Sequence, residues 1–469
     1  MSDLNRRNFL KLSSLTGAGL VLGFRLPDSA AAAVKDDLTV VNMRRQDAAA
    51  FSPNVFLSID TGGIITVQIP RSELGQGVNT TLAMLIAEEL DADWSMVRTE
   101  QAPPGSAYGN QVTGGSRTIA ESYSGFRMAG ATARAMLISA AALTWNVPPD
   151  TCTAEQGVVI HTATDQRLTY GELVAAASTL EVPKRTDVTL KAETDFKLIG
   201  TRVPSKDAPD MVTGRAIYTS DVRLEGMLVG VVARCPVFGG KVASYDASAA
   251  LAVEGVQQVV EISSGIAVVA HNTWAALKGR DALVITWDEG KYADLNSETI
   301  RQMMMEQAVQ TDLDQNADVT QYLEAIYELP YLAHAPMEPL SAAADVRADS
   351  GDIWGMTQNR SGAQNAARNA ADVPMALHVP LIGGQFGRGH WFENIEDAAE
   401  VSRLVAAPVR VIWTREDDMQ HDHYRPASVH WVRAGLDASG QPITWEHHIG
   451  AQGIDGGGSE LLEGAYMPY

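Results

Sequence analysis

The sequence reads Leu381-Ile382-Gly383-Gly384-Gln385-Phe386-Gly387-Arg388-Gly389-His390 at its most informative point. The stretch follows an alternation of apolar residues over 377–381, which predicts a short strand, and it precedes a helical pattern over 394–405. Glycines in such a loop let backbone N–H groups approach a ligand closely, and Arg388 adds a cation beside them. The stretch therefore predicts either a loop that holds an anionic or oxygen-rich ligand or a plain turn between two elements.

Length and composition indicate a large globular protein. The 469 residues are 45% hydrophobic, which is enough for two to four domains with buried cores. The formal net charge of −21 argues against nucleic acid as a partner, because a polyanion would be repelled. Cys152 and Cys235 are the only cysteines, so this chain alone cannot hold an ordinary four-cysteine iron–sulfur cluster or zinc site.

The first 33 residues have the pattern of an export signal. Arg6 and Arg7 precede Phe9, a weakly apolar run follows over 12–24, and small residues fill 30–33. We interpret residues 1–33 as a twin-arginine signal peptide, the alternative being an N-terminal helix. The signal predicts a periplasmic protein exported in the folded state. Beyond it, no apolar run approaches the roughly 20 residues that a membrane span needs.

Two more glycine-rich loops precede predicted helices. A β-hairpin is expected at 55–59 and 65–69, and it leads into Arg71-Ser72-Glu73-Leu74-Gly75-Gln76-Gly77 and a helix over 80–90. Thr113-Gly114-Gly115-Ser116 comes before a helical run at 129–143. Such a turn leaves N–H groups and the positive end of the helix dipole at one place. Each loop alone is either an anion site or an ordinary turn, and three in one chain favour a ligand site.

A polar connector at 182–193 separates these loops from an expected α+β unit. Strands are predicted at 227–232, 256–262, 266–270 and 283–287, with a helix at 274–280. His421, His423 and the pair His447-His448 lack a third ligand at a known spacing, so we expect no metal site there. Hydrolase and NTPase motifs are absent from the sequence.

The three loops, in this order, resemble the molybdenum-binding large subunits of the xanthine dehydrogenase and aldehyde oxidase superfamily. The nearest branch is the exported one that includes isoquinoline 1-oxidoreductase beta subunits. Gln358 is similar to the glutamine that approaches the apical oxo ligand of molybdenum. The other positions that the resemblance implies for cofactor binding are Gly75, Gln76, Gly77, Gly114, Gly115, Ser116, Gly383, Gly384, Phe386, Gly387 and Arg388. No residue is expected to ligate the metal directly.

This resemblance implies an α+β, multi-domain fold with aldehyde oxidase-type molybdopterin-binding domains. The expected domains are an N-terminal molybdopterin-binding segment at 38–185, an α/β hammerhead domain at 195–290, and the first part of a further molybdopterin-binding domain at 320–469. It also implies molybdopterin with molybdenum, in the cytosine dinucleotide form. The expected reaction is hydroxylation of an aldehyde or N-heteroaromatic substrate with oxygen from water. A small partner subunit with 2Fe-2S clusters and a cytochrome c acceptor would remove the electrons.

The chain departs from the family pattern at two places. Gln385 and Gly389 stand where a glycine and a basic residue are usual. The family's catalytic glutamate belongs to a Gly-Val-Gly-Glu segment that this sequence does not contain, so the catalytic residue is unknown and we expect a C-terminally truncated subunit. The alternative is a non-catalytic remnant or one half of a split subunit. A periplasmic solute-binding protein would fit the signal and the charge but would not explain three cofactor-type loops.

Overall fold

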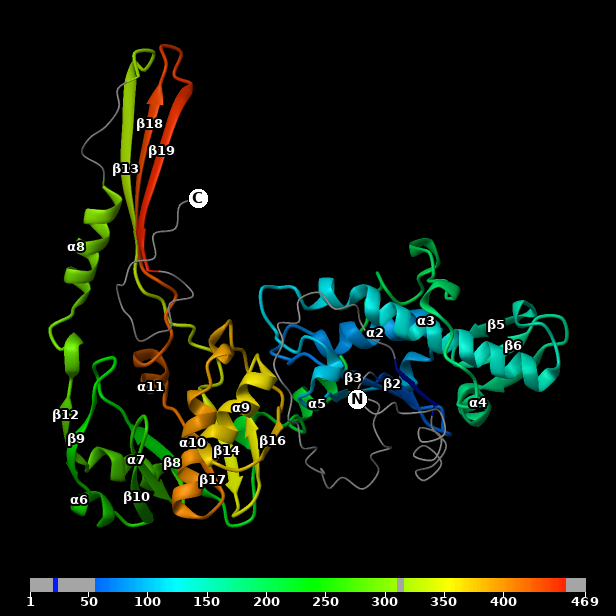
Figure 1. Cartoon of the computed structure of the whole chain (residues 1–469), viewed down its shortest axis with the longest axis horizontal. Coiled ribbons are helices and arrows are strands. Elements are labelled where there is room, and N and C mark those ends of the chain that lie inside the picture. The colour runs from blue at the N-terminus through cyan, green and yellow to red at the C-terminus, as the bar shows by residue number, and fades with distance from the viewer. Residues whose placement is uncertain (1–19, 24–54, 310–315, 453–469) are drawn as a thin grey trace. The chain divides into compact units, whose positions relative to one another are not determined.

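The structure is a computed structural model that describes residues 20–23, 55–309 and 316–452 (Figure 1). It contains two compact units of mixed helix and sheet. The first unit comprises residues 1–225 and 341–408, and the second comprises 226–340 and 409–469. This division runs across two of the predicted domains, since it divides 195–290 between residues 225 and 226 and places 341–408 with the N-terminal segment. All three glycine-rich loops belong to the first unit.

The first unit begins with a four-stranded sheet in the order β1 (Leu20–Gly23), β2 (Val55–Ile59), β3 (Ile65–Ile69) and β4 (Val97–Gln101). The predicted hairpin is confirmed, with Leu57 opposite Val67 in an antiparallel pair. Asp60 closes its turn, because its Oδ1 accepts the amides of Gly62 and Ile64 at 2.9 Å. The strand β1 falls within the predicted signal peptide, whose other residues lie outside the described part. Export stays a prediction.

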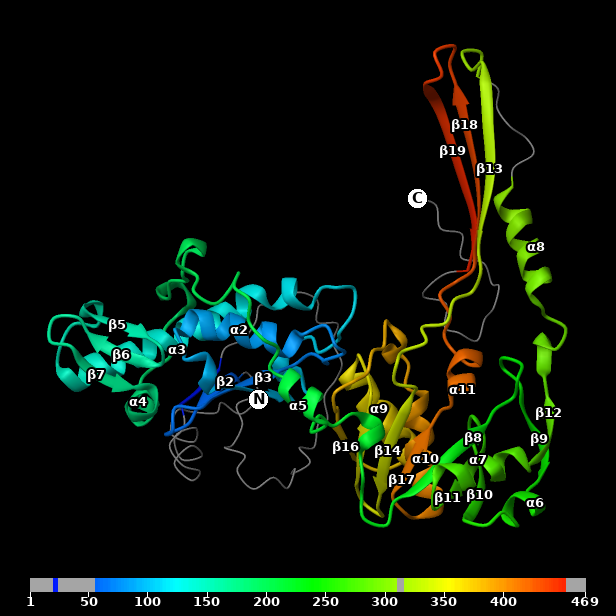
Figure 2. The same cartoon turned by 180° about the vertical axis from the view of Figure 1, so that it is seen from behind.

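Two long helices complete the core of this part. They are α2 (Val78–Leu90) and α3 (Thr118–Trp145), predicted as 80–90 and 129–143, and they run side by side in Figures 1 and 2. Gly130 permits their close approach, since a Cβ there would lie 2.3 Å from the Ile86 carbonyl oxygen. Smaller elements follow: β5 (Cys152–Glu155), β6 (Val158–His161), β7 (Gln166–Thr169), α4 (Tyr170–Ala177) and α5 (Ala208–Thr213).

The rest of the first unit comes from 341–408. Its strands are β14 (Ser341–Val346), β15 (Gly351–Gly355) and β16 (Met375–His378), and its helices are α9 (Arg360–Ala371) and α10 (Glu393–Val405). The strand β15 pairs antiparallel with β14 and parallel with β16. The helix predicted at 394–405 is confirmed. The strand predicted over 377–381 instead ends at His378, so the glycine-rich loop begins earlier than the alternation indicated.

The second unit contains the α+β segment that the sequence predicted. Its elements are β8 (Leu228–Ala233), β9 (Lys241–Asp246), α6 (Ser248–Leu251), β10 (Val256–Ile262), β11 (Gly265–Ala270), α7 (Thr273–Asp281), β12 (Val284–Asp288), α8 (Ser297–Ala308), β17 (Val409–Ile412) and α11 (Arg415–Gln420). A three-stranded antiparallel sheet of β13 (Gln321–Leu329), β18 (Ser428–Leu436) and β19 (Pro442–Ala451) was not predicted. Among the described residues, no helix is long and apolar enough to cross a membrane.

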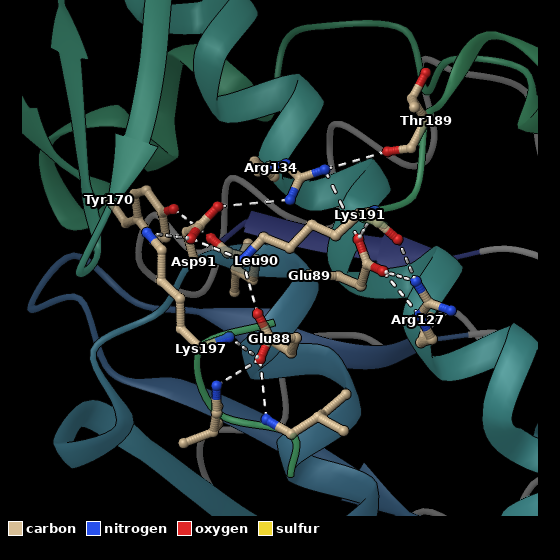
Figure 3. A network of polar contacts seen from close by, with 12 residues as sticks. Glu88, Glu89, Leu90, Asp91, Arg127, Arg134, Tyr170, Thr189, Lys191 and Lys197 are labelled. Atoms are coloured by element: carbon tan, nitrogen blue, oxygen red, sulfur yellow. Dashed lines mark hydrogen bonds and ion pairs between the residues drawn. The ribbon is translucent and has the colours of Figure 1, made fainter. Parts of the chain in front are cut away.

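A cluster of buried charges fixes the connector after residue 188 onto the first unit (Figure 3). The C-terminal end of α2 carries Glu88, Glu89 and Asp91. Negative charges at this end of a helix interact unfavourably with the helix dipole. Arg127 donates to Glu89 at 2.8 Å, and the Lys191 ammonium lies 2.9 Å from Glu88. The Glu88 Oε2 also accepts the amides of residues 197, 198 and 199 at 3.0, 2.6 and 3.0 Å. The connector therefore supplies the donors that the helix end needs.

This cluster predicts a stability loss at low pH. Burial raises the pKa of Glu88. Hydrogen bonds from the Leu198 amide, from Lys191 and from the Ile199 amide together lower this pKa by a larger amount, so the net shift is downward from 4.5. A carboxyl whose folded pKa is lowered stabilises the fold above its unfolded pKa and loses that contribution as the pH falls below it. We expect Glu88→Gln to cost about 1–3 kcal/mol at pH 7, and less at pH 3, in urea unfolding.

The exposed Glu155 on β5 offers a matched control. Glu155→Gln should leave the free energy of unfolding unchanged within roughly 0.5 kcal/mol at both pH values. An equal loss for Glu88→Gln at pH 7 and pH 3 would contradict the role assigned to the Glu88 charge.

Candidate functional site

The three predicted loops meet in the first unit. The amide of Ser72, in the first loop, donates to the Thr113 Oγ1 of the second at 2.9 Å. The Ser72 hydroxyl donates to the carbonyl oxygen of Thr357 at 2.7 Å. The third loop joins through the amide of Ile382, which donates to the Glu73 carbonyl oxygen at 3.3 Å. Segments almost 300 residues apart in the sequence, such as those of Ser72 and Thr357, thus form one surface. This agrees with the expectation that functional sites gather on loops held by a rigid scaffold.

Gln358 connects two of these loops with both ends of its side chain. Its Nε2 donates to the Thr113 carbonyl oxygen at 2.7 Å, and its Oε1 accepts the Gly387 amide at 2.9 Å. Its backbone also pairs with both loops, since the Gln358 amide donates to Gly389 at 2.8 Å and its carbonyl accepts the Thr113 amide at 2.7 Å. With 4% of its surface exposed, Gln358 fixes the relative position of the second and third loops.

The first loop is closed by its own glutamate. The Glu73 Oε1 accepts the amides of Gly75 and Gly77, both at 2.9 Å, and its Oε2 accepts the Asn79 amide at 2.9 Å. This corrects the expectation that the amides at the start of α2 are free to bind an anion, because a carboxylate of the chain already occupies them. The outer side of the loop is nevertheless open, since a Cβ on Gly75 or Gly77 would meet nothing within 4 Å.

Gln76 and the second loop have different surroundings. The Gln76 Oε1 accepts the Leu74 amide at 2.6 Å, so this side chain helps to form the loop. Gly115 and Ser116 have φ angles of 59° and 55° and are exposed. Within the described residues, no hydrogen bond engages the amides of Gly115 and Ser116. A Cβ on Gly114 would lie 2.9 Å from the His390 Nε2, so the second loop packs against the end of the third.

The third loop presents an aromatic ring on a strained backbone. Phe386 has a φ of 56°, between Gly384 at 88° and Gly387 at 116°. A bulky residue in the left-handed region is rare and marks a constrained site. The Phe386 side chain is 69% exposed, and its amide makes no hydrogen bond within the described part of the chain. The loop therefore offers an amide donor and an apolar ring to a ligand.

Two side chains of this loop point inward. Arg388 is 0% exposed and forms an ion pair with Glu393 at 3.0 Å, which differs from the expectation that its cation faces a ligand. Gln385 is also 0% exposed, and its Nε2 lies 2.9 Å from the Met356 sulfur. A Cβ on Gly389 would lie 2.7 Å from the Gln385 Oε1, so the two departures from the family pattern pack against each other. Neither departure lies on the exposed side of the loop.

Sequence reasoning missed two residues that hold the site together. One is Glu73, which belongs to the first loop. Its position two and four residues before Gly75 and Gly77 is the signal that could have identified it, because a carboxylate at this spacing can accept hydrogen bonds from nearby backbone amides. The other is Arg360, at the start of α9, whose guanidinium donates to the Arg71 carbonyl oxygen at 3.0 Å. The sequence gives no signal for Arg360, because its acceptors lie more than 250 residues away.

The chemistry of this surface favours an anionic or oxygen-rich ligand. The donors are backbone amides in glycine-rich turns, which suit phosphate and pterin oxygens. Among the described residues, no group of three or more His, Cys, Asp or Glu side chains could hold a metal ion.

Comparisons with known proteins agree with this chemistry. Models of a molybdopterin cofactor-binding domain match residues 33–226 and 293–457, and these ranges contain all three loops. The isoquinoline 1-oxidoreductase subunit beta of Brevundimonas diminuta is 32% identical over 85% of this chain and 59% of its own length. A membrane-bound aldehyde dehydrogenase (pyrroloquinoline-quinone) of Gluconacetobacter polyoxogenes is 30% identical over 96% of this chain and 60% of its own.

A solved structure is also similar. Quinoline 2-oxidoreductase from Pseudomonas putida 86 aligns with 53% of this chain and 39% of its own, at 20% identity and a TM-score of 0.42. The chain spans about three-fifths of the length of the two relatives above, by their printed shares of 59% and 60%.

Proposed function

Because the chain belongs to the xanthine dehydrogenase family of molybdopterin cofactor-binding subunits, we propose that it is the large subunit of a molybdenum hydroxylase. Its substrate would be an aldehyde or an N-heteroaromatic compound, hydroxylated with oxygen from water. The relatives support these two classes, since one is an isoquinoline oxidoreductase and the other an aldehyde dehydrogenase. The observation that carries the proposal is the convergence of loops from both matched domains on Gln358.

The residues of the site fit a molybdopterin. Uncommitted amides at Gly115, Ser116 and Phe386 suit its phosphate and pterin oxygens, and the open side of Gly75 and Gly77 admits a bulky group. We propose the cytosine dinucleotide form. When bound, the molybdenum centre supplies the oxidation–reduction chemistry, while the protein binds and orients.

Gln358 would hold the second and third loops at a fixed position relative to each other. Its amide is held by Thr113 on one side and Gly387 on the other, so the side chain cannot rotate without breaking both contacts. The position of the Phe386 amide depends on this contact, because Gly387 follows it directly. The exposed Phe386 ring would then form an apolar wall against a flat aromatic or aldehyde substrate.

The proposal includes partner subunits. Two cysteines cannot hold 2Fe-2S clusters, so a small iron–sulfur subunit would carry the electrons to a cytochrome c in the periplasm. A relative is itself named a subunit beta.

The test is purification of the chain with its bound subunits from its own host. We expect stoichiometric molybdenum and a pterin, an iron–sulfur partner, and incorporation of ¹⁸O from labelled water into an oxidised aldehyde or N-heterocycle. A preparation without molybdenum and without such a partner would overturn the proposal. Molybdenum without turnover, when no other polypeptide contributes a base, would select the non-catalytic alternative.

We predict that Gln358→Leu lowers molybdenum content at least about 10-fold, the lower end of the range for residues that support a metal site. The substitution removes the side-chain bonds to Thr113 and Gly387 and lets the second and third loops separate. Metal analysis of the purified protein gives the readout. Gln364→Leu on α9 is the control, because Gln364 donates only to the Met375 carbonyl oxygen, and its metal content should match the wild type. Full metal occupancy in Gln358→Leu would count against the site.

A further inference from the structure

A chain of side-chain hydrogen bonds connects an acid and a base that do not touch each other. The Arg360 guanidinium donates to the Gln101 Oε1, and the Gln101 Nε2 donates to the Asn79 Oδ1 at 3.0 Å. The Asn79 Nδ2 donates in turn to both carboxylate oxygens of Asp207, each at 3.2 Å. We call these four side chains the relay. They come from α9, β4, α2 and the residue that precedes α5.

The two ends of the relay fix the direction of its amides. A guanidinium can only donate and an ionised carboxylate can only accept. Gln101 must therefore turn its oxygen toward Arg360, and Asn79 must turn its nitrogen toward Asp207. Both amide dipoles point the same way, and hydrogen bonds in such a chain strengthen one another by roughly 10–30% per bond. The relay thus transmits the attraction between two charges that form no ion pair.

Both of these charges need such a partner. Arg360 is 0% exposed, and within the described residues its acceptors are backbone carbonyls and the Gln101 amide, with no carboxylate among them. Asp207 is half-buried, and the charged groups that act on it, Glu73 and Asp210, are acidic. Burial lowers the pKa of Arg360 and raises the pKa of Asp207. Each charge therefore costs free energy that hydrogen bonds must offset.

The relay holds the first loop at both of its ends. Arg360 donates to the Arg71 carbonyl oxygen at 3.0 Å, where the loop begins. The Asn79 amide donates to the Glu73 Oε2 at 2.9 Å, where the loop leads into α2. A shift of either Arg360 or Asn79 would therefore move the first loop.

We propose that Asp207 is a positioning residue for the first loop, because it supplies the counter-charge of Arg360 through the two amides of the relay. Asp207 itself contacts no ligand in this role. The role rests on the proposed function, since it matters to a cofactor only if the first loop is part of the cofactor site.

Two substitutions that reverse the relay test this role. Asp207→Asn removes the charge and keeps the shape of the side chain. Gln101→Glu places a carboxylate directly on Arg360, and Asn79 then lies between two carboxylates, one of which must face its oxygen. With both changes present, Asn79 can turn over, donate to the new carboxylate at position 101 and accept from the new amide at position 207. Asp207→Asn should therefore have opposite effects in the two backgrounds.

The measurement is hydrogen exchange of residues 71–79 in the full chain, purified from its own host and followed by mass spectrometry. In the otherwise wild-type chain, Asp207→Asn should speed this exchange about 5-fold, because a neutral hydrogen bond replaces a charge-assisted one. In the Gln101→Glu chain it should slow the exchange. Residues 152–169, on β5, β6 and β7 of the same unit, should exchange at an unchanged rate, which shows that the loosening is local.

A purely structural contact would give Asp207→Asn the same effect in both backgrounds, and that result would overturn the proposal. So would an unchanged rate for 71–79 in the otherwise wild-type chain. Asp210→Asn is the matched control, because Asp210 lies three residues further along and pairs with the exposed Arg215 at 2.8 Å. It removes the same charge outside the relay and should leave the exchange of 71–79 within about twofold of the wild type.

Molybdenum content of the same preparations separates this role from the proposed function. The opposite effects in the two backgrounds, found in a wild-type protein that contains no molybdenum, would support the relay and refute the proposed function. Molybdenum in the wild-type protein, with the same effect of Asp207→Asn in both backgrounds, would support the proposed function and overturn the role of Asp207.

Discussion

Replacing Arg360 with methionine should lower the free energy of unfolding by about 3–5 kcal/mol, the usual cost of removing one partner from a buried charged contact. Arg360 is 0% exposed and donates to the carbonyl oxygens of Ile69 and Arg71 at 3.3 and 3.0 Å. It also donates to Ala102 at 2.5 Å and to the side chain of Gln101. Methionine fills similar space but leaves these buried acceptors without a donor.

The charge of Arg360 is part of this argument. Burial lowers its pKa to about 9, so the guanidinium stays protonated at neutral pH and folding includes a desolvation cost that the acceptors offset. Arg360→Lys keeps the charge but not the planar fork, so it should recover only part of the lost stability. A loss of 3 kcal/mol would be a large share of a typical folding free energy, roughly 5–15 kcal/mol.

The measurement is urea unfolding of the purified chain followed by tryptophan fluorescence. Arg368, in the same helix and exposed, is the matched control, and Arg368→Met should change the free energy of unfolding by less than about 0.5 kcal/mol. If the two variants lost equal amounts, the buried contacts of Arg360 would contribute no more to stability than those of the exposed Arg368, and the first loop would owe its position to other contacts. The loss should also lower molybdenum content, because Arg360 holds the Arg71 carbonyl at the root of the loop.

The spacing of apolar residues was enough to predict those helices and strands in which the buried positions recur with the period of the element itself. The hairpin at 55–69 alternates buried and partly exposed residues along β3, and β10 was predicted with its observed bounds. The helix α10 has a regular apolar stripe, and its predicted range differs by one residue. Glycine-rich turns were recognisable as loops because glycine is favoured at the positive φ angles that Gly75 and Gly387 adopt.

Contacts between distant segments were not predictable in the same way. The strand β13 has apolar residues on both faces, including Leu323, Ile326 and Tyr327, so its pattern lacks the period of two that identifies a strand. Its partner β18 follows about 100 residues later, and this pairing explains the extended form of β13. The inward direction of Arg388 depends likewise on Glu393 and the surrounding core, which the motif does not specify.

Replacing Glu73 with alanine should have the other large effect, a loss of about 3 kcal/mol in the free energy of unfolding. Each charge-assisted hydrogen bond contributes roughly 1–3 kcal/mol, and the total is smaller than the sum because water can enter and bond to the amides that Glu73 leaves. The Glu73 carboxylate is 2% exposed and accepts the amides of Gly75, Gly77 and Asn79. Alanine leaves these donors at the start of α2 unsatisfied. Glu73→Gln retains the shape and one acceptor oxygen, so it should lose less, and urea unfolding of the two variants measures the difference.

The same substitution tests whether the chain's own carboxylate takes the place of an external anion at this helix end. With Glu73 removed, the three amides and the helix dipole form an anion site of the usual kind. Phosphate should therefore raise the unfolding temperature of Glu73→Ala by more than that of the wild type, because a ligand stabilises only the state that binds it. Sodium chloride at equal ionic strength is the control. If phosphate stabilised the wild type equally, the amides of Gly75 and Gly77 would be accessible despite Glu73, and the first loop would be able to hold a cofactor phosphate directly.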